Sequence, residues 1–194
     1  MISQIWTIGH STRKIDYFIS LLEENGVKLV VDVRSLPGSK RHSQFNKEAL
    51  SASLHKAGIR YEHFPELGGR RKPRSDSRNI AWRNASFRGY ADYMETEEFQ
   101  KGIERLVDLA KEVGPTAIMC AEAVWWRCHR ALVSDYLKKR GIEVTHIIDA
   151  NKSDPHPYTS VARIVDGELS YRSESLLQCT ENWVGRDSNP EPTP

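Results

Sequence analysis

The chain has 194 residues, of which 39% are hydrophobic and 28% charged, enough to bury one core and to predict a single domain. No apolar run approaches the ~20 residues of a membrane-spanning helix, and the first residues lack the basic and apolar segments of a secretory signal. Three cysteines do not make a disulfide framework in a chain of this length. These features predict a cytoplasmic protein with reduced thiols and no membrane partner.

The net charge of +2 excludes a polycation that binds nucleic acid through bulk charge alone, but the charge is unevenly distributed. Residues 70–88 carry a net +6, which leaves −4 for the rest of the chain. The basic side chains of this segment are Arg70, Arg71, Lys72, Arg74, Arg78, Arg83 and Arg88. Such a cluster indicates either a site for an anionic partner or a solvated loop.

Short β-branched runs alternate with amphipathic stretches along the chain. In chain order, the pattern predicts a strand at 4–8, a helix at 13–25, a strand at 28–33, a helix at 46–57 and a strand at 59–64. A helix follows Thr96 and ends at Gly114, followed by a strand at 116–120, a helix at 128–140 and a strand at 143–148. The order predicts one α/β domain with a mostly parallel central sheet and helices on both faces.

Three segments depart from this alternation. Residues 163–172 carry Asp166-Gly167 between alternating residues, which predicts a hairpin that adds an antiparallel edge to the sheet. Residues 65–90 show no clear period, and a connection of that length is typically functional or disordered. We expect the domain to cover residues 1–175, and the polar, proline-rich end within residues 176–194 to be a disordered tail.

Ionisable or nucleophilic side chains follow nearly every predicted strand. Ligands bind outside the carboxyl ends of parallel strands, where loops and helix N-termini converge. The sequence therefore predicts one cleft around the residues at these positions, with residues 66–88 packed beside it as a basic flap. The predicted cluster consists of His10, Asp32, Arg34, Glu122, Cys128, His129 and Arg130.

The stretch around Cys128 is the most specific. Cys128 lies at the start of a predicted helix beside Arg127, His129 and Arg130, where the dipole and positive charge stabilise a thiolate. We expect Cys128, Glu122, His10 and His129 to be catalytic, and Asp32 and Cys120 to be structural or orienting. The predicted anion-binding residues are Arg34, Arg130, Arg70, Arg71, Arg88 and Ser11.

A metal site is the alternative use of these side chains. Cys120, Cys128, His129 and His10 offer four soft or borderline ligands, but they lack the paired spacing of a zinc knuckle. Adjacent side chains on a helix also point roughly 100° apart, which disfavours joint coordination by Cys128 and His129. No metal or other cofactor is therefore assigned from the sequence.

Several motifs occur together in one order along the chain. They are Thr7-Ile8-Gly9-His10-Ser11, Asp32-Val33-Arg34-Ser35 with Pro37 and Phe45, Leu67-Gly68-Gly69, Phe87 to Met94 (FRGYADYM), and Cys120-Ala121-Glu122 followed by Cys128-His129-Arg130. Over roughly residues 4–172 the chain resembles the domain of unknown function 488 family. The resemblance implies a single α/β domain with a largely parallel sheet, and it implies no established reaction.

Three functions fit these patterns. The first is an enzyme acting on an anionic substrate, a nucleotide or a nucleic-acid end, with a Cys/His/Glu/Arg site. The second is a non-catalytic nucleic-acid-binding module, because arginines interleave with Trp82, Phe87 and Tyr90. The third is a metal- or redox-responsive thiol protein. The sequence does not indicate an oligomeric state.

Overall fold

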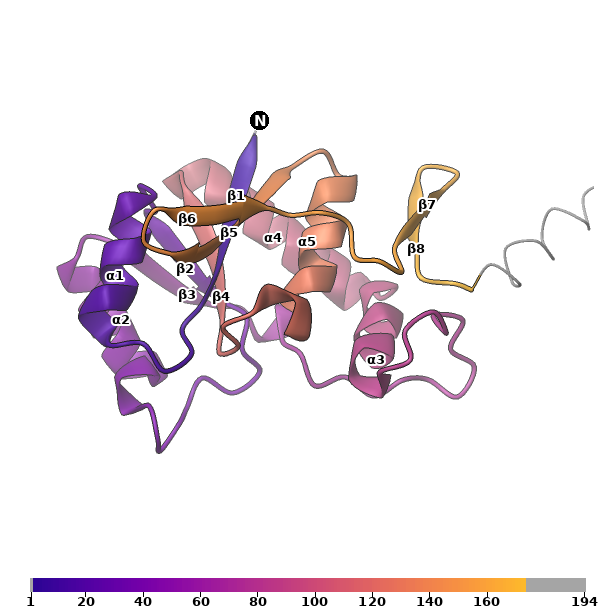
Figure 1. Cartoon of the computed structure of the whole chain (residues 1–194), viewed down its shortest axis with the longest axis horizontal. Helices are drawn as coiled ribbons and strands as arrows, with labels where there is room; N and C mark the ends of the chain where they lie inside the picture. Colours follow the sequence, from indigo (N-terminus) through magenta and orange to yellow (C-terminus); the bar gives the residue numbers. More distant parts are fainter. Residues whose placement is uncertain (1, 174–194) are drawn as a thin grey trace, which may run out of the picture.

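A computed structural model describes residues 2–173 of the chain (Figure 1). Its main sheet has six strands in the order β3-β2-β4-β1-β5-β6. All neighbouring strands are parallel except β5 and β6, which confirms the predicted α/β class with a mostly parallel sheet. The strands are β1 (Gln4–Gly9), β2 (Leu29–Asp32), β3 (Arg60–His63), β4 (Thr116–Cys120), β5 (Glu143–Asp149) and β6 (Lys152–Pro155).

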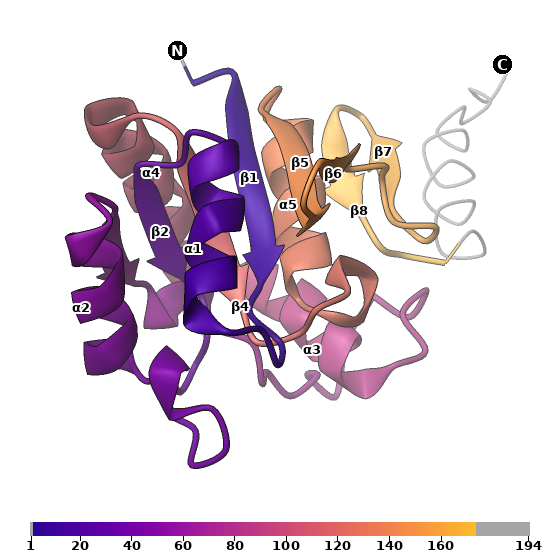
Figure 2. The ribbon, with the colours of Figure 1, turned by 60° about the vertical axis from the view of Figure 1, so that its left-hand side comes forward.

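Helices cover both faces of the sheet (Figure 2). On one face, α1 (Ile15–Glu24) and α2 (Lys47–Lys56) pack against Ile8, Val30 and Met119. On the other face, α3 (Ala85–Met94), α4 (Glu97–Val113) and α5 (Arg130–Lys139) pack against residues that include Leu29 and Ile118. Alternate residues of each strand therefore contribute to two different cores, as the period of two requires.

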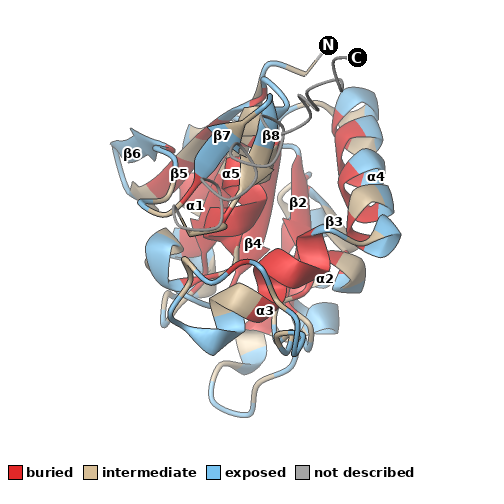
Figure 3. Cartoon of the chain, turned by 90° about the vertical axis from the view of Figure 1, so that its right-hand side faces the viewer, coloured by how far each residue is buried: buried red, intermediate tan, exposed pale blue. Residues whose placement is uncertain are grey.

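The predicted helices form because their apolar residues recur at helical spacing and their ends are satisfied. In α4, the Thr96 hydroxyl accepts a hydrogen bond from the Phe99 backbone N–H at 3.3 Å, which caps the helix at its predicted start. Phe99, Ile103 and Leu106 form its buried stripe, and the opposite side of the helix faces solvent (Figure 3).

Helix α3 begins inside residues 65–90, the segment for which no period was predicted, and extends beyond it. Asn84 caps it by accepting hydrogen bonds from the N–H groups of Ser86 and Phe87. Gly89 sits mid-helix because the backbone around Arg71 crosses there, and a Cβ at Gly89 would lie 2.4 Å from the Arg71 carbonyl oxygen. This crossing places a glycine inside a ten-residue helix and so weakens its sequence signal.

The loop before α3 is held by one buried carboxylate. Asp92 accepts hydrogen bonds from the Arg74 backbone N–H, the Ser77 hydroxyl and the Asn79 amide, at 2.6–2.9 Å. The 3₁₀ turn η2 (Pro65–Leu67) begins the same connection, and two further turns occur at η1 (Ser43–Phe45) and η3 (Trp125–Arg127). The connection between β3 and α3 is therefore a tethered loop.

The C-terminal part differs from the prediction in one respect. The hairpin forms as β7 (Arg163–Val165) and β8 (Glu168–Ser170), but it is a separate two-stranded sheet. The antiparallel edge of the main sheet is β6, which was not predicted because its four residues are all exposed and carry no alternation. The predicted domain boundary and tail lie outside the described residues. Within residues 2–173, no helix has the length and apolarity needed to cross a membrane.

Candidate functional site

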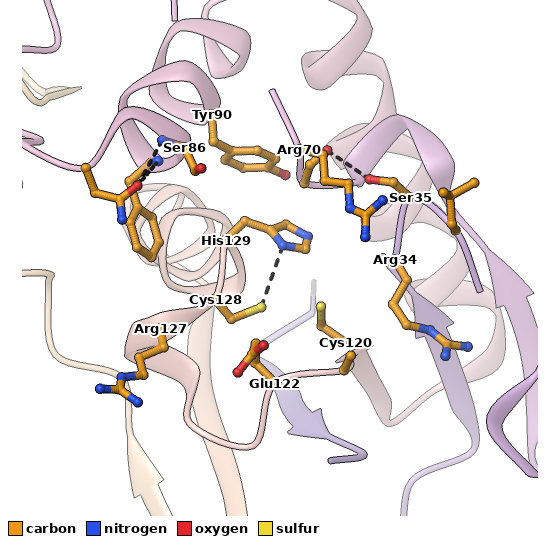
Figure 4. A pocket seen from close by; sticks show the side chains of 15 residues that line it. Arg34, Ser35, Arg70, Ser86, Tyr90, Cys120, Glu122, Arg127, Cys128 and His129 are labelled. Carbon is orange, nitrogen blue, oxygen red and sulfur yellow. Dashed lines mark hydrogen bonds between the residues drawn. The ribbon is translucent and has the colours of Figure 1, made fainter. Parts of the chain in front are cut away.

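A cavity of about 410 Å³ opens beyond the carboxyl ends of β2 and β4 (Figure 4). The chain leaves β2 toward α2 and leaves β4 toward α5, on opposite faces of the sheet. Such a switch in direction between neighbouring strands is where open parallel sheets bind ligands. The walls come from residues 34–36 after β2, residues 69–70 after η2, and residues 120–122 and 127–129 between β4 and α5, together with Asn84, Ser86, Phe87 and Tyr90 at the start of α3.

Cys128 and His129 meet at this cavity, contrary to the prediction that their side chains diverge. Helix α5 begins only at Arg130, and Cys128 has extended backbone angles, φ −125° and ψ 147°. The 100° rule of a helix therefore does not apply, and Cys128 Sγ lies 3.6 Å from His129 Nδ1. The expectation was wrong because the helix starts two residues later than predicted.

The other nitrogen of the His129 ring fixes its orientation. Nε2 lies 3.0 Å from the Val33 carbonyl oxygen, an acceptor, so Nε2 carries a hydrogen and Nδ1 is the nitrogen that can exchange a proton with Cys128. Gly69 makes room for the ring, since a Cβ there would lie 2.9 Å from His129 Nδ1. The Tyr90 ring packs 5.0 Å from the imidazole. The imidazole ring of His129 is thus held in one orientation, with Nδ1 toward the sulfur of Cys128.

Cys120, at the end of β4, brings a second thiol to the site. Both cysteines are buried and free, and their sulfurs and His129 Nδ1 all lie within 4.8 Å of one another. The hydrogen bond with Cys128, together with burial, raises the pKa of Cys120. Burial opposes ionisation of Cys128, but the hydrogen bond from Cys120 and the charges of Arg130 and His129 outweigh it and lower the pKa of Cys128. The opposite shifts favour ionisation of Cys128 over ionisation of Cys120.

Arg130 supports Cys128 from beneath the cavity and does not line it. Its side chain is 1% exposed, and Nε donates to Cys128 Sγ at 3.5 Å. The remaining donors reach the Thr7 hydroxyl at 3.3 Å and the Glu122 carbonyl at 2.5 Å. Arg130, a predicted anion ligand, thus lies beside Cys128 with its guanidinium engaged inside the protein and outside the cavity wall.

The Thr7 hydroxyl continues a buried hydrogen-bond chain. Thr7 is 2.7 Å from His146 Nδ1, His146 is 2.9 Å from His156, and His156 is 3.0 Å from Asp135. Trp125 covers this chain by stacking on His146 with ring centroids 4.3 Å apart. Burial, with the nearby charges of His156 and Arg130, lowers the pKa of His146 to about 2, so the ring is neutral.

His10, Asp32 and Arg34 form a second cluster at the same edge of the sheet. Asp32 and Arg34 are ion-paired at 2.6 Å, and Arg34 also donates to the Phe45 carbonyl and approaches His10 Nε2 at 3.2 Å. Arg34 lines the cavity, but its guanidinium points away from Cys120 (Figure 4). Because alternate strand residues face opposite sides, His10 and Asp32 lie on the α1–α2 side of the sheet, away from the thiols.

The side chains of this second cluster, which we call the brace, make their contacts with other parts of the protein. His10 stacks on Phe45 with centroids 4.2 Å apart, and its Nδ1 is 2.9 Å from the Ser11 carbonyl. Burial lowers the pKa of His10 to about 4. Every guanidinium nitrogen of Arg34 has a partner inside the protein. Neither His10 nor Ser11 lines the cavity.

The predicted basic flap contributes only its two ends to the cavity. At the start of the segment, Arg70 is exposed and lines the cavity wall. At its end, Asn84 and Ser86 at the N-terminus of α3 also line the wall. Arg71 lies over the Tyr93 ring, 3.5 Å from its centroid, and Arg74 pairs with Glu95 at 2.8 Å. Arg88 is half-buried and does not line the cavity. The middle of the segment therefore packs on α3.

The cavity wall also contains residues that were not predicted to belong to the site. They are Ser35, Leu36, Asn84 and Ser86, together with Arg127, which was noted only as a charge. Asn84 could have been recognised as a helix cap, because Phe87, Tyr90 and Met94 follow at helical spacing. Ser35, which donates to the Gly69 carbonyl at 2.8 Å, gives no such signal because its partner is distant in sequence.

Of the comparisons with known proteins, the one with protein families gave a match. Neither the curated proteins nor the solved structures contain a significant match to the chain. One protein family, described as a domain of unknown function, matches residues 14–137, a span that contains Cys120, Cys128 and His129. Since the matched residues make up more than half of the chain, it belongs to the DUF488 family.

Proposed function

We propose that this protein is an enzyme that uses the Cys128 thiolate as a nucleophile on a small anionic substrate bound in the cavity. The observation that carries the proposal is the Cys128–His129 pair. Sγ and Nδ1 are 3.6 Å apart, and the other ring nitrogen is held by the Val33 carbonyl. A nucleophile beside an oriented base is the arrangement that cysteine-dependent group transfer requires.

The proposed step uses each group once. His129 Nδ1 takes the proton of Cys128, which gives a thiolate beside a protonated imidazole, and Sγ then forms a bond to the electrophilic atom of the substrate. The electron pair of the broken bond departs with the leaving group, which takes its proton from His129. Arg130 Nε, 3.5 Å from the sulfur, stabilises the thiolate before the attack. Glu122 is exposed at the cavity wall, where it can contact a donor of the substrate.

The preference for an anion rests on three positive elements around the cavity. Arg70 and Arg127 are exposed and line it. The N-terminus of α3 lines it through Asn84 and Ser86, and a helix N-terminus favours negative charge. A volume of about 410 Å³ is in the range of small-molecule sites and suits a nucleotide-sized anion.

The aromatic side chains do not favour a non-catalytic nucleic-acid module. Trp82 stacks on Phe87 with centroids 4.8 Å apart and also contacts Tyr171. Tyr90 is buried, and its hydroxyl donates to the Leu67 carbonyl. Of these rings only Phe87 and Tyr90 line the cavity, so the rings do not form an open row on which successive bases could stack. A catalytic thiolate must also stay reduced, which is why we propose the cytoplasm as the place of action.

Residue-specific alkylation tests the nucleophile. The full chain, in a Cys179→Ser background and with a chelator present, is labelled with iodoacetamide as a function of pH. We expect Cys128 to react with a midpoint below that of an ordinary thiol, and Cys120 to react slowly. Cys120→Ser keeps a hydroxyl donor to Cys128, whereas Cys120→Ala removes it. The alanine variant should therefore move the Cys128 midpoint to higher pH than the serine variant does.

The charge of the reagent tests the anion preference. Iodoacetate and iodoacetamide carry the same leaving group, so their rate ratio reports the local field. Relative to the urea-denatured chain, the folded chain should favour iodoacetate by about tenfold. Arg70→Met and Arg127→Met should reduce this ratio, and Arg83→Met, an exposed residue outside the cavity, should not. An unreactive Cys128, or a ratio equal to that of the denatured chain, would contradict the proposal.

A further inference from the structure

Cys120, Cys128 and His129 have the spacing of metal ligands. Zinc binds sulfur at about 2.3 Å and histidine nitrogen at about 2.0–2.1 Å, so a tetrahedral site separates S from N by roughly 3.6 Å and S from S by roughly 3.8 Å. Cys128 Sγ and His129 Nδ1 are 3.6 Å apart, and all three ligand atoms lie within 4.8 Å of one another. The three atoms can therefore reach one ion with shifts on the order of 1 Å.

Neighbouring groups hold these three side chains in the way that metal ligands are usually held. A ligating histidine almost always donates its other N–H to a carbonyl or a carboxylate, and His129 Nε2 faces the Val33 carbonyl at 3.0 Å. Val33 is itself held, because its N–H donates to the Met119 carbonyl at 2.9 Å. Arg130 Nε donates to Cys128 Sγ at 3.5 Å, and its charge offsets part of the negative charge of two thiolates.

We propose that Cys120, Cys128 and His129 bind one Zn²⁺ ion, with the fourth coordination position open to the cavity. Two sulfurs and one imidazole form a donor set for a thiophilic cation, whereas Mg²⁺ and Ca²⁺ take oxygen ligands. All three residues line the cavity, so the position they leave free faces it. Three protein ligands with one open position distinguish such a site from a closed structural zinc site.

The metal site has a consequence for the nucleophile. A thiolate bound to zinc is no longer free to attack, so the metal-loaded protein should lack the reactivity of Cys128. This regulatory statement rests on the proposed function, whereas the metal site itself does not.

Cobalt provides the spectroscopic test. The full chain is reduced, stripped of metal with a chelator and titrated with Co²⁺ under argon. We expect one equivalent to bind, with a near-ultraviolet sulfur-to-cobalt charge-transfer band and the intense visible bands of four-coordinate Co²⁺, and Zn²⁺ to abolish both. Cys120→Ser, Cys128→Ser and His129→Asn should each weaken binding by more than the roughly 10- to 100-fold that loss of an outer partner costs. Cys179→Ser is the matched control and should bind normally.

Each outcome decides the proposal. Absence of a 1:1 complex, an octahedral spectrum, or an unchanged titration of Cys128→Ser would overturn it. Far-UV circular dichroism shows whether each variant folds. If a variant does not fold, protection of Cys128 in the unsubstituted chain from iodoacetamide by one equivalent of Zn²⁺ decides instead. Cobalt binding with an unreactive metal-free Cys128 would refute the enzyme and keep the metal site, and the reverse result would refute only the metal site.

Discussion

The Asp32–Arg34 ion pair allows a prediction of stability that can be worked from the contacts. Asp32 is fully buried and accepts from the Arg34 backbone N–H at 3.0 Å, Arg34 Nε at 2.9 Å, Arg34 Nη2 at 2.6 Å and the Tyr61 hydroxyl at 2.7 Å. In Asp32→Asn, the amide NH₂ would face guanidinium donors and leave a buried charge without its partner. Breaking such a pair costs about 3–5 kcal/mol.

The assay is reversible unfolding of the full chain in urea and by heat, followed by circular dichroism. For a chain of this size, 1 kcal/mol corresponds to about 2–4 °C, so Asp32→Asn should lower Tm by roughly 6–20 °C. Arg34→Met should be similarly damaging, because it strands the carboxylate. The double variant Asp32→Leu/Arg34→Met should be more stable than either single variant, since it removes both buried charges.

A small effect would refute this reasoning. A loss below about 1 kcal/mol for Asp32→Asn is what an exposed pair gives, and it would mean that the pair is not desolvated. A stable Arg34→Met variant that also lost the preference of Cys128 for iodoacetate would show that Arg34 acts on anions in the cavity. In that case Arg34 would be a binding residue and not a brace.

Two further predictions concern backbone packing and acid stability. Gly9→Ala should destabilise the fold by about 3 kcal/mol in urea unfolding, because its Cβ would lie 1.8 Å from the Glu122 carbonyl oxygen, whereas Gly38→Ala, with no neighbour within 4 Å, should be neutral. Burial lowers the pKa of His10 from 6.5 to about 4 and that of His146 to about 2, so protons bind the unfolded chain first. The free energy of unfolding should therefore fall as pH drops below 6.5, by about 3 kcal/mol for His10 on reaching pH 4. His10→Gln should flatten this dependence, and an unchanged profile would contradict the assignment.

The sequence determined the elements whose signals are local. The nine predicted strands and helices all occur, because apolar periodicity, caps such as Thr96 and glycine stops act over a few residues. Their alternation also determined the parallel sheet, and with it the edge at which residues after β2 and β4 meet. That rule placed Glu122, Cys128 and His129 at this edge, whereas Cys120 was expected to be a structural or orienting residue.

Only the tertiary structure shows that the predicted site residues are divided between the two faces of the sheet. Because successive strand residues face opposite sides, His10 and Asp32 point to the α1–α2 core, while Cys120 points toward α5. The sequence shows that successive strand residues alternate between the two faces of the sheet. Which of the two faces carries the cavity depends on the directions of the crossover connections. The brace around Arg34 depends on Phe45 and His10, which are far from it along the chain.

The same physical reason explains the two largest surprises. Helix α3 begins in the segment where no period was predicted, and it was missed because the backbone around Arg71 crosses it at Gly89, a contact that sequence spacing does not record. Cys128 and His129 converge because α5 starts at Arg130, and helix boundaries depend on the packing of the preceding turn. Local patterns thus supplied the elements and their polarity, whereas the orientation of each reactive side chain was set by contacts between segments that are distant in the sequence.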